Sequence, residues 1–171
     1  ALNSLSITQG ITNPHITGVP AGTWIITTAN SSNGILDQAI NIAETDTITT
    51  GAITGANIVL SADLTAGGSP TVNISGTTFN DIPAAGYIKV TFPAGFTINT
   101  TAGAVTASGT APALTNVTCT VSGQVVSIPV ASVFTVGALN SLSITQGVNN
   151  PYASGDPGTW TITTTSSAVN I

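Results

Sequence analysis

The side chains of this sequence that could carry out chemistry are few, and three of them are carboxylates close together. Asp37, Glu44 and Asp46 lie within ten residues in a threonine-rich stretch. Carboxylate oxygens are ligands that Ca²⁺ prefers, and Glu44 and Asp46 would share one face of an extended segment, where a cation relieves their repulsion. The spacing matches no EF-hand loop. A calcium ion is therefore one interpretation, and solvated acids of a connector are the other.

The residues that usually act as nucleophiles or bases form no constellation. The only histidine, His15, is replaced by Tyr152 in a second copy of the same segment. The single cysteine, Cys119, alternates in step with Val117 and Val121, which predicts an inert thiol pointing into the core. Glycine-rich stretches lack the lysine or helix that phosphate binding requires. We therefore predict no enzymatic activity and no organic cofactor.

Lys89 and four asparagines complete the reactive groups. Ile88 and Val90 predict that the strand turns its apolar face inward and Lys89 outward, the wrong side for a buried Lys–Asn cross-link. Four N-x-S/T sequons are present, a number that the serine and threonine content alone would produce. The resulting glycosylation candidates are Asn30, Asn73, Asn99 and Asn116.

The chain is almost uncharged. Charged residues make up 4% of it and the net charge is −5, with one cation among 171 residues. This excludes nucleic acid as a partner, because phosphate binding needs several lysines or arginines. The apolar runs are too short for a membrane-spanning helix. A surface of threonine, serine, asparagine and glycine has little charge repulsion, which favours association with neighbouring molecules or a covering of sugars.

An internal repeat is the most informative feature of the sequence. Residues 1–10, ALNSLSITQG, recur letter for letter at 138–147, and the likeness continues to a second tryptophan. The copies are 137 residues apart, which is the length of one domain. The chain therefore resembles one and a quarter units of a tandem array.

The two copies also indicate which side chains face a core. Trp24 and Ile26 recur as Trp160 and Ile162, whereas the residue between them changes from isoleucine to threonine. Alternate residues of a strand face opposite sides. The conserved pair is therefore predicted to share the buried face, with the variable position pointing outward.

The elements that must position these residues are predicted to be strands. Threonine, valine and isoleucine dominate and are interrupted by glycine, proline and asparagine. A tight hairpin is expected at Ser122-Gly123. The best helix candidate, ILDQAINIAE, is predicted to be a loop or an additional strand. Strands are expected near residues 4–9, 22–29, 53–62, 70–78, 86–92, 95–107, 113–121, 124–130, 139–145 and 158–165.

Two parts of the chain are expected. Residues 1–50 are interpreted as the closing strands of a preceding unit plus a connector, and residues 51–171 as a nearly complete β-sandwich unit. The first part would lack the strands with which it should pair. Such a fragment exposes sheet edges and an apolar face until a neighbouring unit or subunit covers them.

Residues 79–98, FNDIPAAGYIKVTFPAGFTI, resemble a repeat of large bacterial and archaeal surface proteins of the adhesin-like kind. The resemblance covers most of residues 53–165, and its motifs make a fold and carry no catalytic group. It implies an Ig-like antiparallel β-sandwich in a secreted tandem array. The matching segments are the turn at 83–86, the strand at 88–93, Gly95-Phe96, the hairpin at 117–126, and the closing motif at 13–26 and 150–162.

These features predict a structural protein of the cell surface or extracellular space. Its units would join head to tail into a filament or surface layer, with itself or adjoining repeats as the partner and strand donation as one mechanism. The predicted assembly interface comprises Leu5, Ile7, Trp24 and Ile26. The alternatives are a spacer in an adhesin stalk, which would stay monomeric, and a carbohydrate-binding module, which would need exposed aromatic rings.

Overall fold

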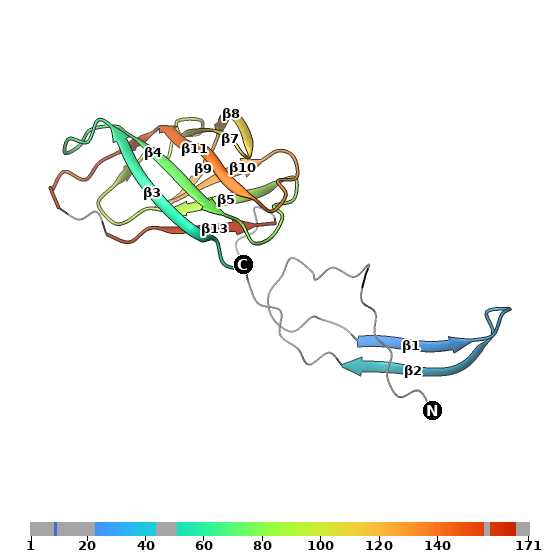
Figure 1. Ribbon diagram of the computed structural model, residues 1–171. Coiled ribbons are helices and arrows are strands. Elements are labelled where there is room, and N and C mark those ends of the chain that lie inside the picture. Colours follow the sequence, from blue (N-terminus) through green and yellow to red (C-terminus); the bar gives the residue numbers. More distant parts are fainter. Residues whose placement is uncertain (1–8, 10–22, 44–50, 156–157, 167–171) are drawn as a thin grey trace. The chain divides into compact units, whose positions relative to one another are not determined.

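The protein is all-β and divides into two compact units, Ala1–Thr50 and Gly51–Ile171 (Figure 1). The computed structural model describes residues 9, 23–43, 51–155 and 158–166. This part of the chain contains strands and no helix, so it has no helix that could cross a membrane. The all-β class predicted from the composition is confirmed.

The described part of the first unit is an antiparallel hairpin. Strand β1 (Thr23–Ala29) pairs with β2 (Ile35–Ala43). The Oδ1 atom of Asn30 orders the turn between them, because it accepts hydrogen bonds from the backbone N–H groups of Ser32 (3.0 Å) and Gly34 (2.9 Å). Of the two structures predicted for ILDQAINIAE, the additional strand is the one observed.

The second unit is built from two larger antiparallel sheets and a short strand pair. The smaller of the large sheets has the order β13-β5-β10-β9, and the other has the order β3-β4-β11-β7-β8. The strands of the first are Thr161–Thr165, Gly86–Thr91, Val125–Val130 and Thr120–Ser122. Those of the second are Thr54–Ala62, Pro70–Thr77, Ala138–Gln146, Thr106–Thr110 and Ala113–Thr118. The pair is β12 (Val148–Asn149) with β6 (Thr97–Ile98).

One apolar core lies between the two larger sheets. Both β5 and β10 alternate between buried and half-buried residues, as expected for strands with one face on a core. Each fully buried aliphatic side chain contributes about 1.5–3 kcal/mol relative to exposure. The aliphatic residues with no measurable exposure are Val72, Ile88, Val90, Val126, Ile128, Leu142 and Ile144. This two-layer arrangement is that of a β-sandwich.

The single strand predicted over residues 95–107 is wrong, because a loop divides it. The Asn99 side chain accepts a hydrogen bond from the backbone N–H of Thr101 (2.9 Å), and the N–H of Ala104 returns to the Thr101 carbonyl (3.0 Å). Gly103 completes this turn with a φ of 83°, a conformation that favours glycine. The short strand β6 and the longer β7 lie on either side of it.

The predicted hairpin between β9 and β10 is present one residue further along. Ser122 pairs with Val125, so the two turn residues are Gly123 and Gln124, with Gly123 at a φ of 56°.

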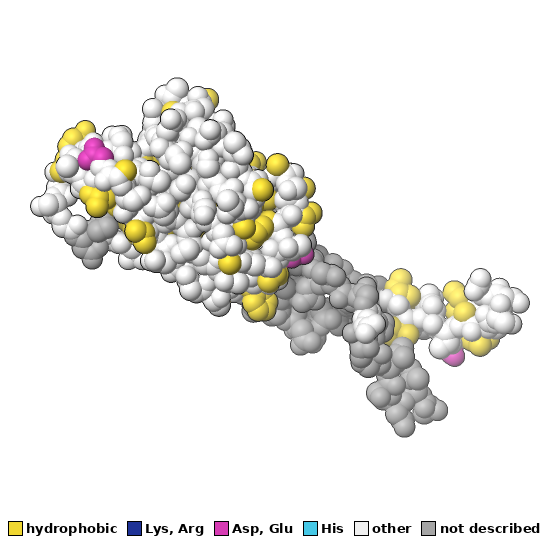
Figure 2. Space-filling model, turned by 45° about the horizontal axis from the view of Figure 1, so that its top comes forward, with side chains coloured by type: hydrophobic (Ala, Val, Ile, Leu, Met, Phe, Trp, Pro, Cys, Tyr) yellow, Lys and Arg dark blue, Asp and Glu magenta, His cyan; other side chains and the backbone are white. Residues whose placement is uncertain are grey.

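The visible surface of the described residues is mainly uncharged. In Figure 2 it is mostly white, with scattered hydrophobic side chains and few acids.

Candidate assembly site

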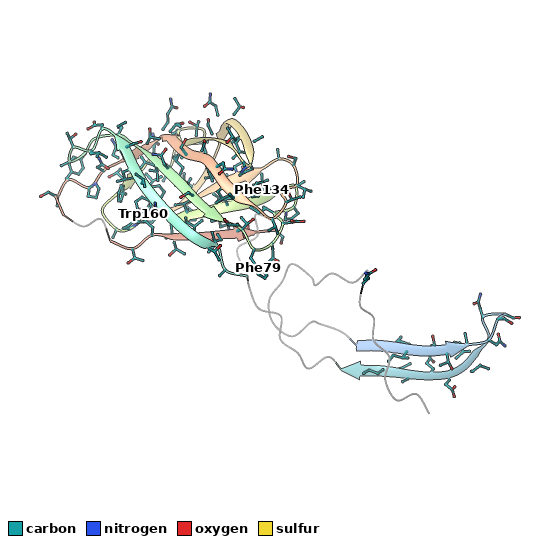
Figure 3. The ribbon with its side chains drawn as sticks, in the orientation of Figure 1. Phe79, Phe134 and Trp160 are labelled. Atoms are coloured by element: carbon teal, nitrogen blue, oxygen red, sulfur yellow. The ribbon has the colours of Figure 1, made fainter. Side chains whose placement is uncertain are left out.

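The closing strand of the second unit carries an aromatic anchor. The Trp160 ring, labelled in Figure 3, belongs to a cluster of three aromatic rings. The distance between ring centroids is 4.6 Å to Phe92 and 5.0 Å to Phe96. The two phenylalanine rings are 5.6 Å apart. Aromatic pairs at these separations contribute beyond the area that they bury. Trp160, which directly precedes β13, therefore anchors the start of this strand to the core.

Within the described part of the chain, β13 lies at the edge of its sheet and pairs with β5 alone. In this register Ile162 is opposite Val90, and Thr163 is opposite Lys89. Val90 is fully buried, and Ile162 packs against the same core, whereas Thr163 is exposed. The predicted division of this strand into a core face and an outer face is confirmed for the second copy of the repeat.

The first copy of the same motif has a different partner. There Trp24 pairs with Ile42 of β2, and Ile26 pairs with Ala39 across a register shift. Ile26 is 52% exposed and Ile25 63%, so the hairpin leaves apolar side chains open on both faces. The other large apolar residues exposed on it are Ile35, Leu36 and Ile40. Leu5 and Ile7 of the predicted interface lie outside the described residues.

A second part of the closing motif fastens a loop of the five-stranded sheet. Asn150 is 5% exposed, and its Nδ2 atom donates to the backbone carbonyls of Asp63 and Thr65, both at 2.9 Å. Its backbone N–H donates to the Gly68 carbonyl (2.7 Å). Asn149 adds a bond from its Nδ2 to the Gly67 carbonyl (3.2 Å). The loop after β3 is thereby held against the segment that precedes β13.

We expect Asn150→Ala to lower the free energy of unfolding of the second unit by about 2 kcal/mol. The substitution removes two hydrogen bonds made by a side chain that is only 5% exposed, and it leaves the two carbonyls without these donors. Urea denaturation followed by circular dichroism measures the change. Asn13→Ala, at the corresponding position of the first copy, is the matched control and should leave this transition in place. A loss below about 0.5 kcal/mol would show that the clamp is dispensable.

Asp63 also orders this loop through its carboxylate. The oxygen atoms accept hydrogen bonds from the hydroxyl and the backbone N–H of Thr65 and from the N–H of Ser69. These bonds, the Thr65 hydroxyl first, lower the pKa of Asp63 below its ordinary value. The sequence analysis gave neither Asp63 nor Asn150 a role. The one available signal was the Asn-Pro pair retained in both copies of the repeat.

The predicted calcium ligands are only partly covered by the structure. Asp37 is exposed on β2, where its carboxylate accepts a hydrogen bond from the Thr28 hydroxyl (3.0 Å). Glu44 and Asp46 lie outside the described residues. Within the described ranges, no three histidine, cysteine or acidic side chains form a group that could hold a metal ion. Calcium binding by the three acids therefore stays a prediction.

The glycosylation candidates differ in the availability of their amide nitrogens. The Nδ2 atom of Asn73 donates to the Val59 carbonyl (3.1 Å) and to the Ser61 hydroxyl (2.8 Å). Both of its hydrogens are engaged in the folded sheet. The other three side chains are exposed in a turn, a loop and an edge strand: Asn30, Asn99 and Asn116. Sugars on the folded protein would fit these three positions better than Asn73.

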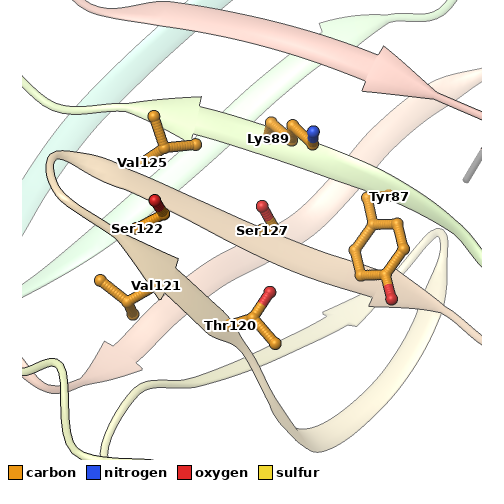
Figure 4. Close-up of a pocket in the computed structure, with 7 residues that line it drawn as sticks. All are labelled: Tyr87, Lys89, Thr120, Val121, Ser122, Val125 and Ser127. Carbon is orange, nitrogen blue, oxygen red and sulfur yellow. The ribbon is translucent and has the colours of Figure 1, made fainter. Parts of the chain in front are cut away.

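Lys89 lies on the outer face of the four-stranded sheet, as predicted, because its neighbours Ile88 and Val90 are fully buried. It borders a shallow pocket of about 170 Å³ (Figure 4). The pocket presents one ammonium group and several hydroxyls, without the nucleophile–base pair that covalent catalysis needs. The other residues that line it are Tyr87, Thr120, Val121, Ser122, Val125 and Ser127.

Cys119 is buried between β8 and β9, as its alternation with the two valines predicted. Burial raises the pKa of its thiol from 9.0 to about 12. The nucleophilic thiolate is therefore scarce at neutral pH. The thiol belongs to the core and not to a reactive site.

Cys119 is expected to resist iodoacetamide at pH 8 in the folded protein and to react once urea unfolds it. Between the unfolded value of 9.0 and the folded value of about 12, the unfolded chain binds fewer protons. The free energy of unfolding should therefore fall as the pH rises through this range. The Cys119→Ala chain, measured across the same pH range, should lack the part of this fall in the free energy of unfolding that the thiol causes. The parts caused by other groups that titrate at alkaline pH should remain. Fast labelling of the folded protein would contradict the assigned burial.

Comparison with known proteins gives no match. No family model matches the sequence, and no curated protein or solved structure matches the chain. The function must therefore be argued from the two copies of the closing motif and the surfaces around them.

Proposed function

We propose that this protein is a structural unit of an extracellular filament or surface layer, assembled head to tail through its β-sandwich units. The observation that carries the proposal is the contrast between the two copies of one motif. In the second unit, Trp160 and Ile162 pack against the core of a sandwich. In the first, the corresponding strand β1 pairs with β2 alone among the described residues, and Ile26 is half exposed.

The energetics of an isolated hairpin support association. A two-stranded hairpin in water is marginally stable by itself. Covering an exposed isoleucine such as Ile26 would contribute about 1.5–3 kcal/mol, before the cost of ordering the joint. The low charge of the chain removes most of the repulsion that would keep such units apart.

Negative-stain electron microscopy of the native preparation, with a denaturing gel of the same sample, tests the proposal. Regular fibres whose subunit runs near 16.9 kDa would mean noncovalent polymerisation. Fibres built from a far larger polypeptide would mean a covalent array of such units. Dispersed monomers at high protein concentration would contradict a filament and favour the spacer of an adhesin stalk.

A further inference from the structure

We propose that the hairpin of β1 and β2 is a donor element that docks on β5 of a second copy of this chain, in the place that β13 occupies. In the docked state Ile26 would lie opposite Val90, and Trp24 would rest on Phe92 and Phe96. The joint presupposes the assembly proposed above and specifies its contact.

The register follows from the repeat. Trp24 corresponds to Trp160, so Ile26 takes the position of Ile162 and Thr27 that of Thr163. The positions that face the core or the partner strand are retained between the copies. Two positions of the strands vary, Ile25 against the exposed Thr161 and Ala29 against Thr165, and both have the parity opposite to that of Trp24 and Ile26. A strand that keeps its inward residues and varies only outward fits the same edge of β5.

The hairpin would also add β2 to the docked sheet, outside β1. β9 and β8 are edge strands of the two sheets, and a single residue, Cys119, connects them. These two edges therefore lie on the same side of the sandwich, and the opposite edges, β13 and β3, lie on the other side. On β3, Ile58 and Leu60 are only half buried. An additional strand beyond the β13 position would extend over this apolar edge, and Ile42 of β2, which pairs with Trp24 and so shares its face, supplies a side chain to cover it.

The proposed occupant is β1 of a second copy, because β1 repeats the motif by which β13 holds this edge of β5. Docking is then an exchange, in which β1 of one molecule displaces β13 of another. Contacts of Trp160 and Ile162 are lost and equivalent contacts of Trp24 and Ile26 are gained, so the exchange at β5 is nearly neutral in free energy. The apolar surface of β2 that the joint covers supplies the net stabilisation. The displaced β13 is itself a free donor for a third molecule. Exchange of an equivalent element between protomers in this manner is domain swapping, and repeated in one direction it gives an open chain.

A donor–acceptor mixture tests the joint. The acceptor carries Ile162→Asp, which weakens its own β13, and Ile26→Asp, which prevents it from donating. Mixed with the unaltered chain, it should form a 1:1 complex in size-exclusion chromatography with light scattering. A donor with Ile26→Asp should bind at least about tenfold more weakly, whereas Ile25→Asp, on the outward face, should bind as the unaltered chain does. Equal weakening by both donors, or no complex with a folded acceptor, would overturn the proposal.

Cross-linking keeps the proposal testable if the acceptor does not fold. A Thr27→Cys chain and a Lys89→Cys chain, refolded together under mild oxidation, should form a disulfide-linked heterodimer, because these positions would be opposite each other. Ser122→Cys in place of Lys89→Cys is the matched control, since Ser122 lies on the strand at the far edge of the same sheet. Heterodimer yields no higher than this control would overturn the docking. If the heterodimer yield is no higher than the control but the unaltered chain still forms fibres, the proposed function holds and the contact between units is a different one.

Discussion

A Trp160→Ala chain is expected to lose about 3 kcal/mol of the free energy of unfolding of its second unit. The ring contacts both Phe92 and Phe96 and lies at the start of β13, so its removal leaves a gap beside two aromatic rings. Replacement of a packed aromatic residue by alanine typically costs 3–5 kcal/mol, and Trp160 is half buried, which places the loss at the lower end. Because β5 is the one strand that pairs with β13 in the described ranges, hydrogen exchange of β13 should accelerate first.

The repeat supplies the control for this experiment within the same chain. Trp24→Ala removes the same side chain from the same motif, but β1 pairs with β2 in the first unit. The urea transition of the second unit, followed by circular dichroism, should therefore shift by less than about 0.5 kcal/mol. Equal losses from the two substitutions would show that the anchoring role does not depend on the partner strand β5, contrary to the structure.

The sequence predicted side-chain orientation correctly wherever a strand packs one face on the core, because apolar and polar residues then alternate along it. Ile88 and Val90 inside with Lys89 outside, and Cys119 pointing inward, were each readable from period-two alternation. The same reasoning divided the faces of β13 correctly, because the two copies of the motif act as a natural substitution experiment. In these places burial alone decides the structure.

Local hydrogen bonding decided the elements that alternation misread. The loop around Asn99 and Gly103 breaks an otherwise continuous run of strand-forming residues, because the Asn99 side chain accepts a hydrogen bond from the backbone of the loop.

The uncertainty over β2 has a different cause. β2 carries a mixture of polar and apolar residues without regular alternation, and both Leu36 and Ile40 are exposed. A strand that does not divide into a buried and a solvated face gives no period-two signal.

Contacts distant in sequence were beyond the reach of the pattern. Asn150 binds the Asp63 carbonyl across 87 residues, and this bond depends on the packing of β12 beside the loop after β3. Likewise, the pairing of β13 with β5 rather than with a neighbour in sequence follows from the whole sandwich. Residue types at one position cannot specify which of several polar loops will meet them.

Assembly should respond strongly to one single substitution in β1 and hardly at all to the same substitution one residue away. We expect Ile26→Thr to raise the critical concentration for fibre formation at least about tenfold, because each joint would exchange a buried isoleucine for a threonine with a hydroxyl to desolvate. A tenfold change corresponds to about 1.4 kcal/mol per joint. Sedimentation of fibres across a concentration series, with the soluble fraction measured, gives this value directly.

Ile25→Thr is the matched control, since it makes the same chemical change one residue away. The second copy of the motif already has threonine there, at the exposed position 161, so the docked strand should accept it. Its critical concentration should stay within about twofold of that of the unaltered chain. In isolation Ile25 is the more exposed of the two, at 63% against 52%. Nonspecific apolar association would therefore be weakened at least as much by Ile25→Thr, and only docking by the face that carries Trp24 and Ile26 predicts the opposite order.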